Sequence, residues 1–148
     1  MISGLITRDQ WQAERALWAT FLLPPAIYVF STFDTHVSPC FSEKKCLRDV
    51  KFLQKEAMRS GKVPDIKYNF LITAHGKIIE GRGWIYCPGV PTKYRNFLQR
   101  SIYIGFMGNF TRDDPPRTMY YARDRIIEFG LKNDYISQKV LEFVLKKN

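Results

Sequence analysis

The chain has 148 residues, of which 45% are apolar and 15% aromatic, and its formal net charge is +9. This length and composition predict one domain with one core, spanning residues 1–148, and exclude a disordered tail. No apolar run reaches the roughly 18 residues of a membrane-spanning helix, and Met1–Gly4 lacks the basic start of a signal peptide. The positive charge favours acidic partners, but it is dispersed, which is more typical of a solvated surface.

The N-terminal third contains a turn and a strand. Thr7 and Gln10 have the spacing of a capping box, which predicts a short helical turn that carries Trp11 into the core. The prolines Pro24 and Pro25 favour an extended backbone. Ala26–Phe30 is a continuous apolar run, which predicts a strand covered on both faces and central in a sheet.

A helix is predicted from Ser42, a suitable N-cap, to Gly61, a suitable stop. Apolar residues recur there at spacings of three and four, which gives one buried stripe. The stripe comprises Cys46, Val50, Leu53 and Ala57.

A hairpin follows the helix. Tyr68–Ile72 and Ile78–Trp84 are short runs rich in apolar residues, and a turn at His75–Lys77 separates them. Two glycines flank Arg82 before Trp84, so this end of the hairpin can present a guanidinium beside a flat apolar ring. The alternative is a strand end with a solvated arginine.

The C-terminal half completes an α/β pattern. Tyr86–Gln99 has no clear period and is predicted to be a loop, whereas Ser101–Phe110 is predicted to be a strand. A helix is predicted to start at Asp113–Pro116, with Met119, Ala122, Ile126 and Phe129 on one face, and a last helix at Ser137–Lys146. This order predicts a single α/β domain with a central mixed β-sheet flanked by helices.

The chain has three cysteines. Cys40 and Cys46 are close enough in sequence to form a disulfide if the backbone turns back, or they are two buried thiols. Cys87 is left over, either buried or as a free thiol.

Several motifs resemble the peptidoglycan recognition proteins (PGRPs), relatives of the type-2 N-acetylmuramoyl-L-alanine amidases. They occur in the family's order and comprise Arg8–Trp11, Tyr68–Ile72, Glu80–Trp84 and Ser101–Phe110. The resemblance implies the PGRP fold and the family's disulfide between Cys40 and Cys46, hence an oxidising, extracellular or cell-surface location. Any membrane anchor or targeting segment would then lie outside these residues.

The amidases of this family bind Zn²⁺ through two histidines and a cysteine. At the two histidine positions the resemblance places Ser31 and Pro91, and no stretch resembles the C-terminal segment that carries the cysteine. Catalytic zinc needs about three protein ligands and an open position. The resemblance therefore implies a protein that is not an enzyme, has no catalytic residue, metal ligand or cofactor, and keeps Tyr68 of the catalytic site for packing or ligand contact.

The resemblance also implies a set of ligand-binding positions, possessed in full or only as remnants: Thr32, Tyr68, Arg82, Trp84 and Asn96. In some members an arginine at the Arg82 position pairs with the extra carboxylate of meso-diaminopimelate, which a guanidinium can bind through two hydrogen bonds. Trp84 is equally explained as a core aromatic.

The absence of one groove wall predicts weak or lost peptidoglycan binding. The chain resembles the regulatory, membrane-anchored members, such as the LF type, and is expected to regulate innate immune signalling by contacting another PGRP receptor ectodomain. The alternative is a genuine sensor of diaminopimelate-type peptidoglycan fragments. A nucleic-acid partner is not expected, since no stripe of Lys and Arg accompanies the charge. Asn109 begins an N-glycosylation sequon, which is consistent with an exported glycoprotein.

Overall fold

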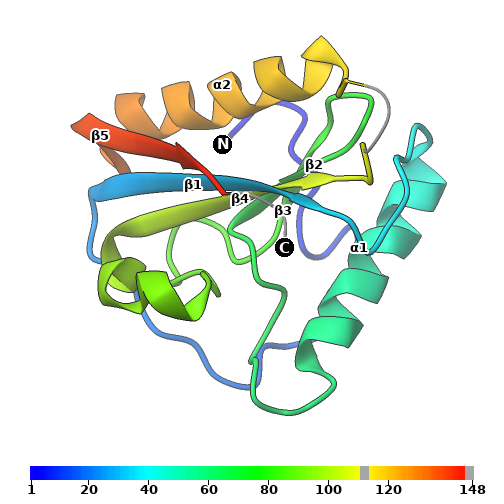
Figure 1. Ribbon diagram of the computed structural model, residues 1–148, viewed down its shortest axis with the longest axis horizontal. Coiled ribbons are helices and arrows are strands. Elements are labelled where there is room, and N and C mark those ends of the chain that lie inside the picture. The colour runs from blue at the N-terminus through cyan, green and yellow to red at the C-terminus, as the bar shows by residue number, and fades with distance from the viewer. Residues whose placement is uncertain (111–113, 146–148) are drawn as a thin grey trace.

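Five strands form one mixed sheet in the order β3–β2–β4–β1–β5 (Figure 1). The computed structural model describes residues 1–110 and 114–145. The strands are β1 (Ala26–Asp34), β2 (Phe70–Ile72), β3 (Ile78–Glu80), β4 (Ser101–Met107) and β5 (Ile136–Val144). The pairs β1–β4, β1–β5 and β2–β4 are parallel, and only the hairpin pair β2–β3 is antiparallel.

One helix covers each face of the sheet. The helix α1 (Glu43–Met58) buries Cys46, Val50 and Leu53 against one face, and α2 (Arg117–Lys132) lies along the other (Figure 1). A 3₁₀ helix, η1 (Thr92–Arg100), leads into β4. The predicted α/β domain with a mixed sheet and flanking helices is confirmed. Within residues 1–110 and 114–145, no helix combines the length and the apolar character needed to cross a bilayer.

The alternation of β1 decides which of its side chains can meet at a site. Val29 and Phe33 pack in the α2-side core, and the Ser31 hydroxyl accepts a hydrogen bond from Arg123 of α2. Phe30 packs in the α1-side core, and Asp34 contacts Tyr68 of that core. Because neighbouring residues of a strand point to opposite faces, Thr32 and Asp34 share the α1 side, whereas Ser31 does not.

The predicted caps are confirmed. Thr7 and Gln10 exchange hydrogen bonds between side chains and backbone amides, and Trp11 is 1% exposed. The Ser42 hydroxyl accepts from the amide of Lys45 at the start of α1. Gly61, with φ of +75°, donates its amide to the Met58 carbonyl and ends the helix.

The hairpin, the β1 strand, the β4 strand and the α2 helix also lie close to where the sequence predicted them. β1 extends four residues beyond Phe30 to Asp34, and it lies inside the sheet between β4 and β5. Gly76 makes the hairpin turn at φ of +82°, which suits glycine. The helix predicted from Asp113–Pro116 begins at Arg117, and Asp113 lies outside the described residues.

Two predictions are wrong. Residues Ser137–Lys146 do not form a last helix: β5 runs in parallel beside β1 through Val144. A short apolar run fits a helix or a buried strand equally well, and here pairing with the free side of β1 prevails. Tyr86–Gln99 is not wholly a loop, because it contains most of η1.

A disulfide joins Cys40 to Cys46, across the connection between β1 and α1. Both cysteines are fully buried on the α1 side of the sheet. Cys87 is a buried free thiol whose sulfur donates to the Phe21 carbonyl at 3.3 Å.

Replacing both Cys40 and Cys46 by alanine is expected to lower the free energy of unfolding by about 2 kcal/mol, because the closed loop is short. Denaturant unfolding of the two proteins measures this difference. A reducing agent should destabilise the wild type by a similar amount and leave the double variant unchanged. An equal response of both proteins to reduction would show that the bridge does not stabilise the fold.

Candidate functional site

A tyrosine and an aspartate form the buried polar centre of the α1 face. The Tyr68 hydroxyl donates to Oδ2 of Asp34 at 2.7 Å, and both residues are buried. The other oxygen, Oδ1, accepts from the His36 amide and lies 3.0 Å from Nδ1 of the largely exposed His36 ring. Both carboxylate oxygens of Asp34 therefore have partners within the chain.

The Tyr68 ring owes its position to a glycine. A Cβ added to Gly105 of β4 would lie 2.9 Å from the ring, so only glycine lets the ring lie against the strand. Tyr103, also on β4, packs against Tyr68 with its ring centre 4.9 Å away. Thr32 pairs with Gly105 in the β1–β4 register, which places it beside the same ring.

Burial keeps both tyrosines neutral. It raises the pKa of Tyr68 well above the usual value, and the negative charge of Asp34 raises it further. Burial also raises the pKa of Tyr103 to about 12, against a smaller opposing effect of its hydrogen bond with Thr32. At neutral pH Tyr68 is a hydrogen-bond donor and not a base.

A cleft of about 240 Å³ opens beside this centre, between Tyr68 and α1. We call it the Tyr68 cleft, and its lining comprises Asp34, His36, Leu53, Glu56, Ala57, Val63, Ile66, Lys67 and Tyr68. Pockets that enclose a small ligand usually measure about 300–1,000 Å³. The Tyr68 cleft is therefore smaller than a typical ligand site.

The donor set does not fit a catalytic zinc ion. Zinc catalysis uses about three His, Cys, Asp or Glu ligands. Across residues 1–110 and 114–145 no three such side chains are grouped to hold a metal. Asp34 and His36 are two possible ligands beside Tyr68, and they bind one another. His75, in the hairpin turn, is paired with Thr73.

The two positions matched to zinc-binding histidines lie away from Tyr68. Ser31 is buried on the opposite face of the sheet, where its Oγ lies 3.2 Å from Nε of Arg123. Pro91 is an exposed residue at the start of η1. The assignment of Ser31 to the site is thus corrected: from β1, the site receives Thr32 and Asp34. The alternation of the strand, counted from the buried Phe30, could have indicated this.

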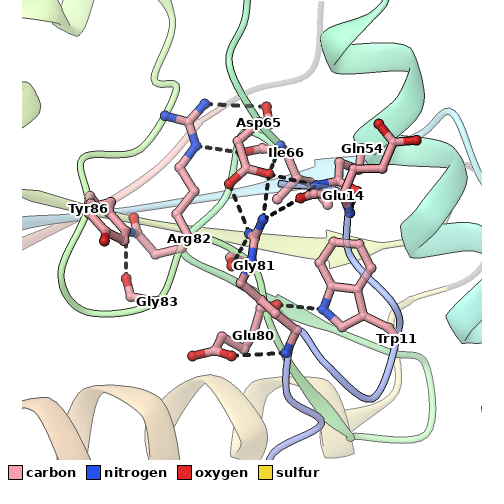
Figure 2. Close-up of polar contacts among 12 residues, drawn as sticks. Trp11, Glu14, Gln54, Asp65, Ile66, Glu80, Gly81, Arg82, Gly83 and Tyr86 are labelled. Carbon is pink, nitrogen blue, oxygen red and sulfur yellow. Dashed lines mark hydrogen bonds and ion pairs between the residues drawn. The ribbon is translucent and has the colours of Figure 1, made fainter. Parts of the chain in front are cut away.

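Arg82 is held by the main chain (Figure 2). Its guanidinium donates to the carbonyls of Ile66 at 2.5 Å, Cys87 at 2.8 Å and Asp65 at 3.4 Å. Burial lowers the pKa of Arg82 from its usual value, and the nearby Asp65 carboxylate partly opposes this. All three nitrogens are engaged, although the contact through Nη2 is long.

Asp65 is a buried acceptor that the sequence did not reveal. Its carboxylate forms a two-oxygen pair with Arg8, with the shorter contact at 2.9 Å. It also accepts from Nε2 of Gln54 on α1 at 2.9 Å (Figure 2). Asp65 thereby ties the N-terminal turn to α1 beside Arg82. The residue sits in a loop with no motif spacing of its own, so only the family-like Arg8 hinted at it.

The remaining predicted ligand residues are separate from Tyr68. Trp84 packs on the α2 side, where its ring is stacked on Tyr135 with centres 4.9 Å apart and planes at 8°. Asn96 is exposed on η1. The structure therefore brings together Thr32 and Tyr68, holds Arg82 through carbonyls, and places Trp84 on the other face of the sheet.

A second cleft, of about 380 Å³, lies between the segments around Trp18, Lys62–Lys67 and Cys87–Leu98. Its lining includes Lys62, Lys67, Arg82 and Arg95 and no carboxylate, and we call it the basic cleft. A larger cleft of about 530 Å³ lies on the other side of Arg82, and its charged residues include Arg8 and Asp65, which pair with each other.

The raised pKa values predict a loss of stability at high pH. An unfolded tyrosine loses its proton near pH 10, whereas folded Tyr103 holds it to about pH 12. Stability from this group is therefore complete below about pH 10 and falls as the pH rises toward 12. Denaturant unfolding across this range should give a shallower fall for Tyr103→Phe than for wild type. The exposed Tyr121→Phe is the matched control, and an identical slope in all three proteins would contradict the prediction.

Comparison with known proteins gives a consistent result, although no protein-family model matches the chain. A peptidoglycan recognition protein of Trichoplusia ni is 26% identical over 134 residues, which are 90% of this chain and 71% of that protein. Peptidoglycan recognition protein 3 of Mus musculus is 29% identical over 144 residues, 97% of this chain and 40% of the mouse protein. A short peptidoglycan-recognition protein of Drosophila melanogaster is 33% identical over 104 residues, 70% of this chain and 54% of the fly protein.

Solved structures with the same fold include Drosophila PGRP-LB, at 25% identity and a TM-score of 0.87, with 95% of this chain and 81% of that chain covered. Bumblebee PGRP-SA gives 26% identity and a TM-score of 0.86 over 95% and 81% of the two chains. PGRP-LE, solved with tracheal cytotoxin, gives 24% identity and a TM-score of 0.88 over 96% and 82%.

The similarity extends across several branches and does not single out the LF type. Sequence similarity over most of the chain, joined to the shared fold, shows that the chain belongs to the peptidoglycan recognition protein family.

Proposed function

We propose that this chain is a non-catalytic PGRP domain that regulates innate immune signalling by contacting another PGRP receptor ectodomain, with weak or no affinity for peptidoglycan fragments. The observation that carries the proposal is the contact between Tyr68 and Asp34. At the point where an amidase of this fold needs a metal-bound water, the chain has a carboxylate held by a phenol.

The groups around Tyr68 are unsuited to amide hydrolysis. Thr32 and Tyr103 supply hydroxyls, and Asp34 and His36 are the two side chains there that can bind zinc. Two ligands fall short of the three that catalytic zinc requires. Tyr68 is neutral and donates its proton to Asp34, so it is not available as a base.

Weak affinity for peptidoglycan fragments is supported by the state of Arg82. To pair with a ligand carboxylate, its guanidinium would have to leave the carbonyls of Ile66 and Cys87, which lie beside it in the interior. Leaving a buried carbonyl without a donor costs about 1–3 kcal/mol. Such a cost offsets much of what a new charged hydrogen bond contributes.

A protein contact is supported by exposed apolar side chains beside the basic cleft. Trp18 is 49% exposed and lines that cleft, and Phe21, 65% exposed, stacks on Tyr86. Large exposed apolar side chains that lie close together are typical of interaction surfaces.

An extracellular or cell-surface location is supported by the disulfide between Cys40 and Cys46, since such bonds persist in oxidising compartments. Asn109 is an exposed candidate for glycosylation, although Thr111 of its sequon lies outside the described residues. A single glycan at Asn109 would fit this location.

The basic cleft favours a second candidate function, that of a sensor for diaminopimelate-type fragments. Arg82 lines this cleft together with Lys62, Lys67 and Arg95, and the ligand carries carboxylates. PGRP-LE, a structural neighbour, was solved with tracheal cytotoxin, a monomeric diaminopimelic acid-type peptidoglycan. In this case Arg82→Ala would abolish binding of diaminopimelate-type fragments and spare lysine-type fragments.

Calorimetry with a diaminopimelate-type muropeptide tests the proposal, together with metal analysis and an amidase assay on the same protein. We expect binding weaker than micromolar, no stoichiometric zinc and no cleavage, because the ligand set is incomplete and Arg82 is engaged. A second titration uses a PGRP receptor ectodomain and should give saturable binding. Micromolar muropeptide affinity would support the sensor, and cleavage abolished by a chelator would contradict both candidates.

Arg82→Ala should destabilise the isolated domain by about 2–3 kcal/mol, because it leaves the buried carbonyls of Ile66 and Cys87 without a donor. Denaturant unfolding without ligand measures the change. Arg95→Ala, which removes an exposed arginine of the same cleft, is the matched control and should stay within about 0.5 kcal/mol of wild type. Unchanged stability of Arg82→Ala would show that Arg82 is free for a ligand.

A further inference from the structure

The basic cleft has a one-sided charge. Four cationic side chains and no carboxylate line it. The apolar part of the lining is formed by Trp18, Val63, Pro64, Pro88, Val90 and Leu98. Since the cleft is concave and about 380 Å³ in volume, it has room for a bulky apolar side chain below a cationic rim.

Three of the four cations have no counter-charge. Within the described parts of the chain, the side chains of Lys62, Lys67 and Arg95 make no hydrogen bond and no ion pair, and all three residues are exposed. Arg82 differs, because its guanidinium donates to carbonyls. Three like charges around one concave surface create a local positive potential that attracts an anionic partner.

We propose that the basic cleft is the docking site for an acidic segment of the partner protein, one that carries a bulky apolar side chain between carboxylates. The inference rests on the proposed function, in which the chain acts through a protein contact. The carboxylates would pair with Lys62, Lys67 and Arg95, and the apolar side chain would pack against Trp18, Val63 and Leu98.

The shape and charge of the cleft select this chemistry. An aromatic or large aliphatic side chain seated in a desolvated pocket is a typical centre of a protein interface. Charges at the rim chiefly speed the encounter and exclude partners of the same sign. A nucleic acid would need a longer track of cations than these three. A muropeptide has the carboxylates but lacks the bulky apolar side chain that would contact Trp18.

The first experiment uses a fluorescent probe peptide in which tryptophan is flanked by two glutamates on each side. Its binding to the intact chain is followed by anisotropy. Two control peptides replace the glutamates by glutamine or the tryptophan by alanine. We expect both replacements to weaken binding by about tenfold or more, and binding of the acidic peptide to fall as salt rises. Equal binding of the glutamine peptide would overturn the proposal.

Two sets of charge reversals locate the site. Lys62→Glu, Lys67→Glu and Arg95→Glu together remove the rim, and Lys77→Glu, Arg117→Glu and Lys132→Glu make the same change in net charge at exposed positions outside the lining of the cleft. The rim variant should lose about tenfold in affinity, or 1.4 kcal/mol, while the control variant stays within about twofold. Equal losses would overturn the site. Trp18→Ala, which changes no charge, should weaken the peptide with tryptophan and not the one with alanine.

A titration with a PGRP receptor ectodomain separates this inference from the proposed function. Saturable binding that the rim variant weakens and the control variant does not supports both. Saturable binding unaffected by the rim variant contradicts this docking site and leaves the proposed function standing. Absence of ectodomain binding contradicts the proposed function, and muropeptide binding in its place that requires the same rim residues contradicts both.

Discussion

The buried amide of Asn69 is the constraint on which the site depends. Its Nδ2 donates to the carbonyls of Gly83 and Tyr86, both at 2.9 Å, and its Oδ1 accepts from the Tyr103 amide at 2.7 Å. Its own backbone groups bond to Tyr103, Gly81 and Gly83. One fully buried residue thus joins the start of β2, the strand β4 and the turn that carries Arg82. A buried amide with every group satisfied specifies one arrangement, because any other leaves polar atoms unpaired.

The direction of the two neighbouring functional side chains follows from this anchor. Tyr68 precedes Asn69, and its carbonyl accepts from the Arg82 amide at 2.8 Å, so the backbones of the two residues are locked together. Gly81 permits this approach, since a Cβ there would lie 2.1 Å from the Tyr68 carbonyl oxygen. Tyr68 then meets Asp34, and Arg82 meets the carbonyls of Ile66 and Cys87. Both side chains find their partners inside the chain.

This internal pairing separates recognition from the old groove. A buried donor and a buried carboxylate that satisfy each other stabilise the fold and have little capacity left for a ligand. Free charge remains on exposed cations such as Lys62, Lys67 and Arg95, which carry no fold-stabilising contact among the described residues. The chemistry that can still attract a partner is therefore at the surface, where it suits a protein contact better than a reaction.

Local patterns in the sequence predicted most of the fold. The capping box at Thr7, the N-cap Ser42 and the hairpin around Gly76 are short-range features that need no tertiary information, and each was confirmed. The strand β5 was missed, because its apolar spacing also fits a helix and only β1 decides between them. The site was predicted in part. Tyr68 and Thr32 do lie together, but Asp34 and Asp65 act through partners far away in the sequence, which no local motif reveals.

The most direct test of the central claim is the side-chain Nε–H of Arg82, observed by NMR before and after a diaminopimelate-type muropeptide is added. The account predicts a proton that exchanges slowly with water, because it is bonded to the Ile66 carbonyl, and a signal that does not move with ligand. Rapid exchange in the free protein, or a saturable shift on titration, would contradict the account, because Arg82 would then be free to bind a ligand.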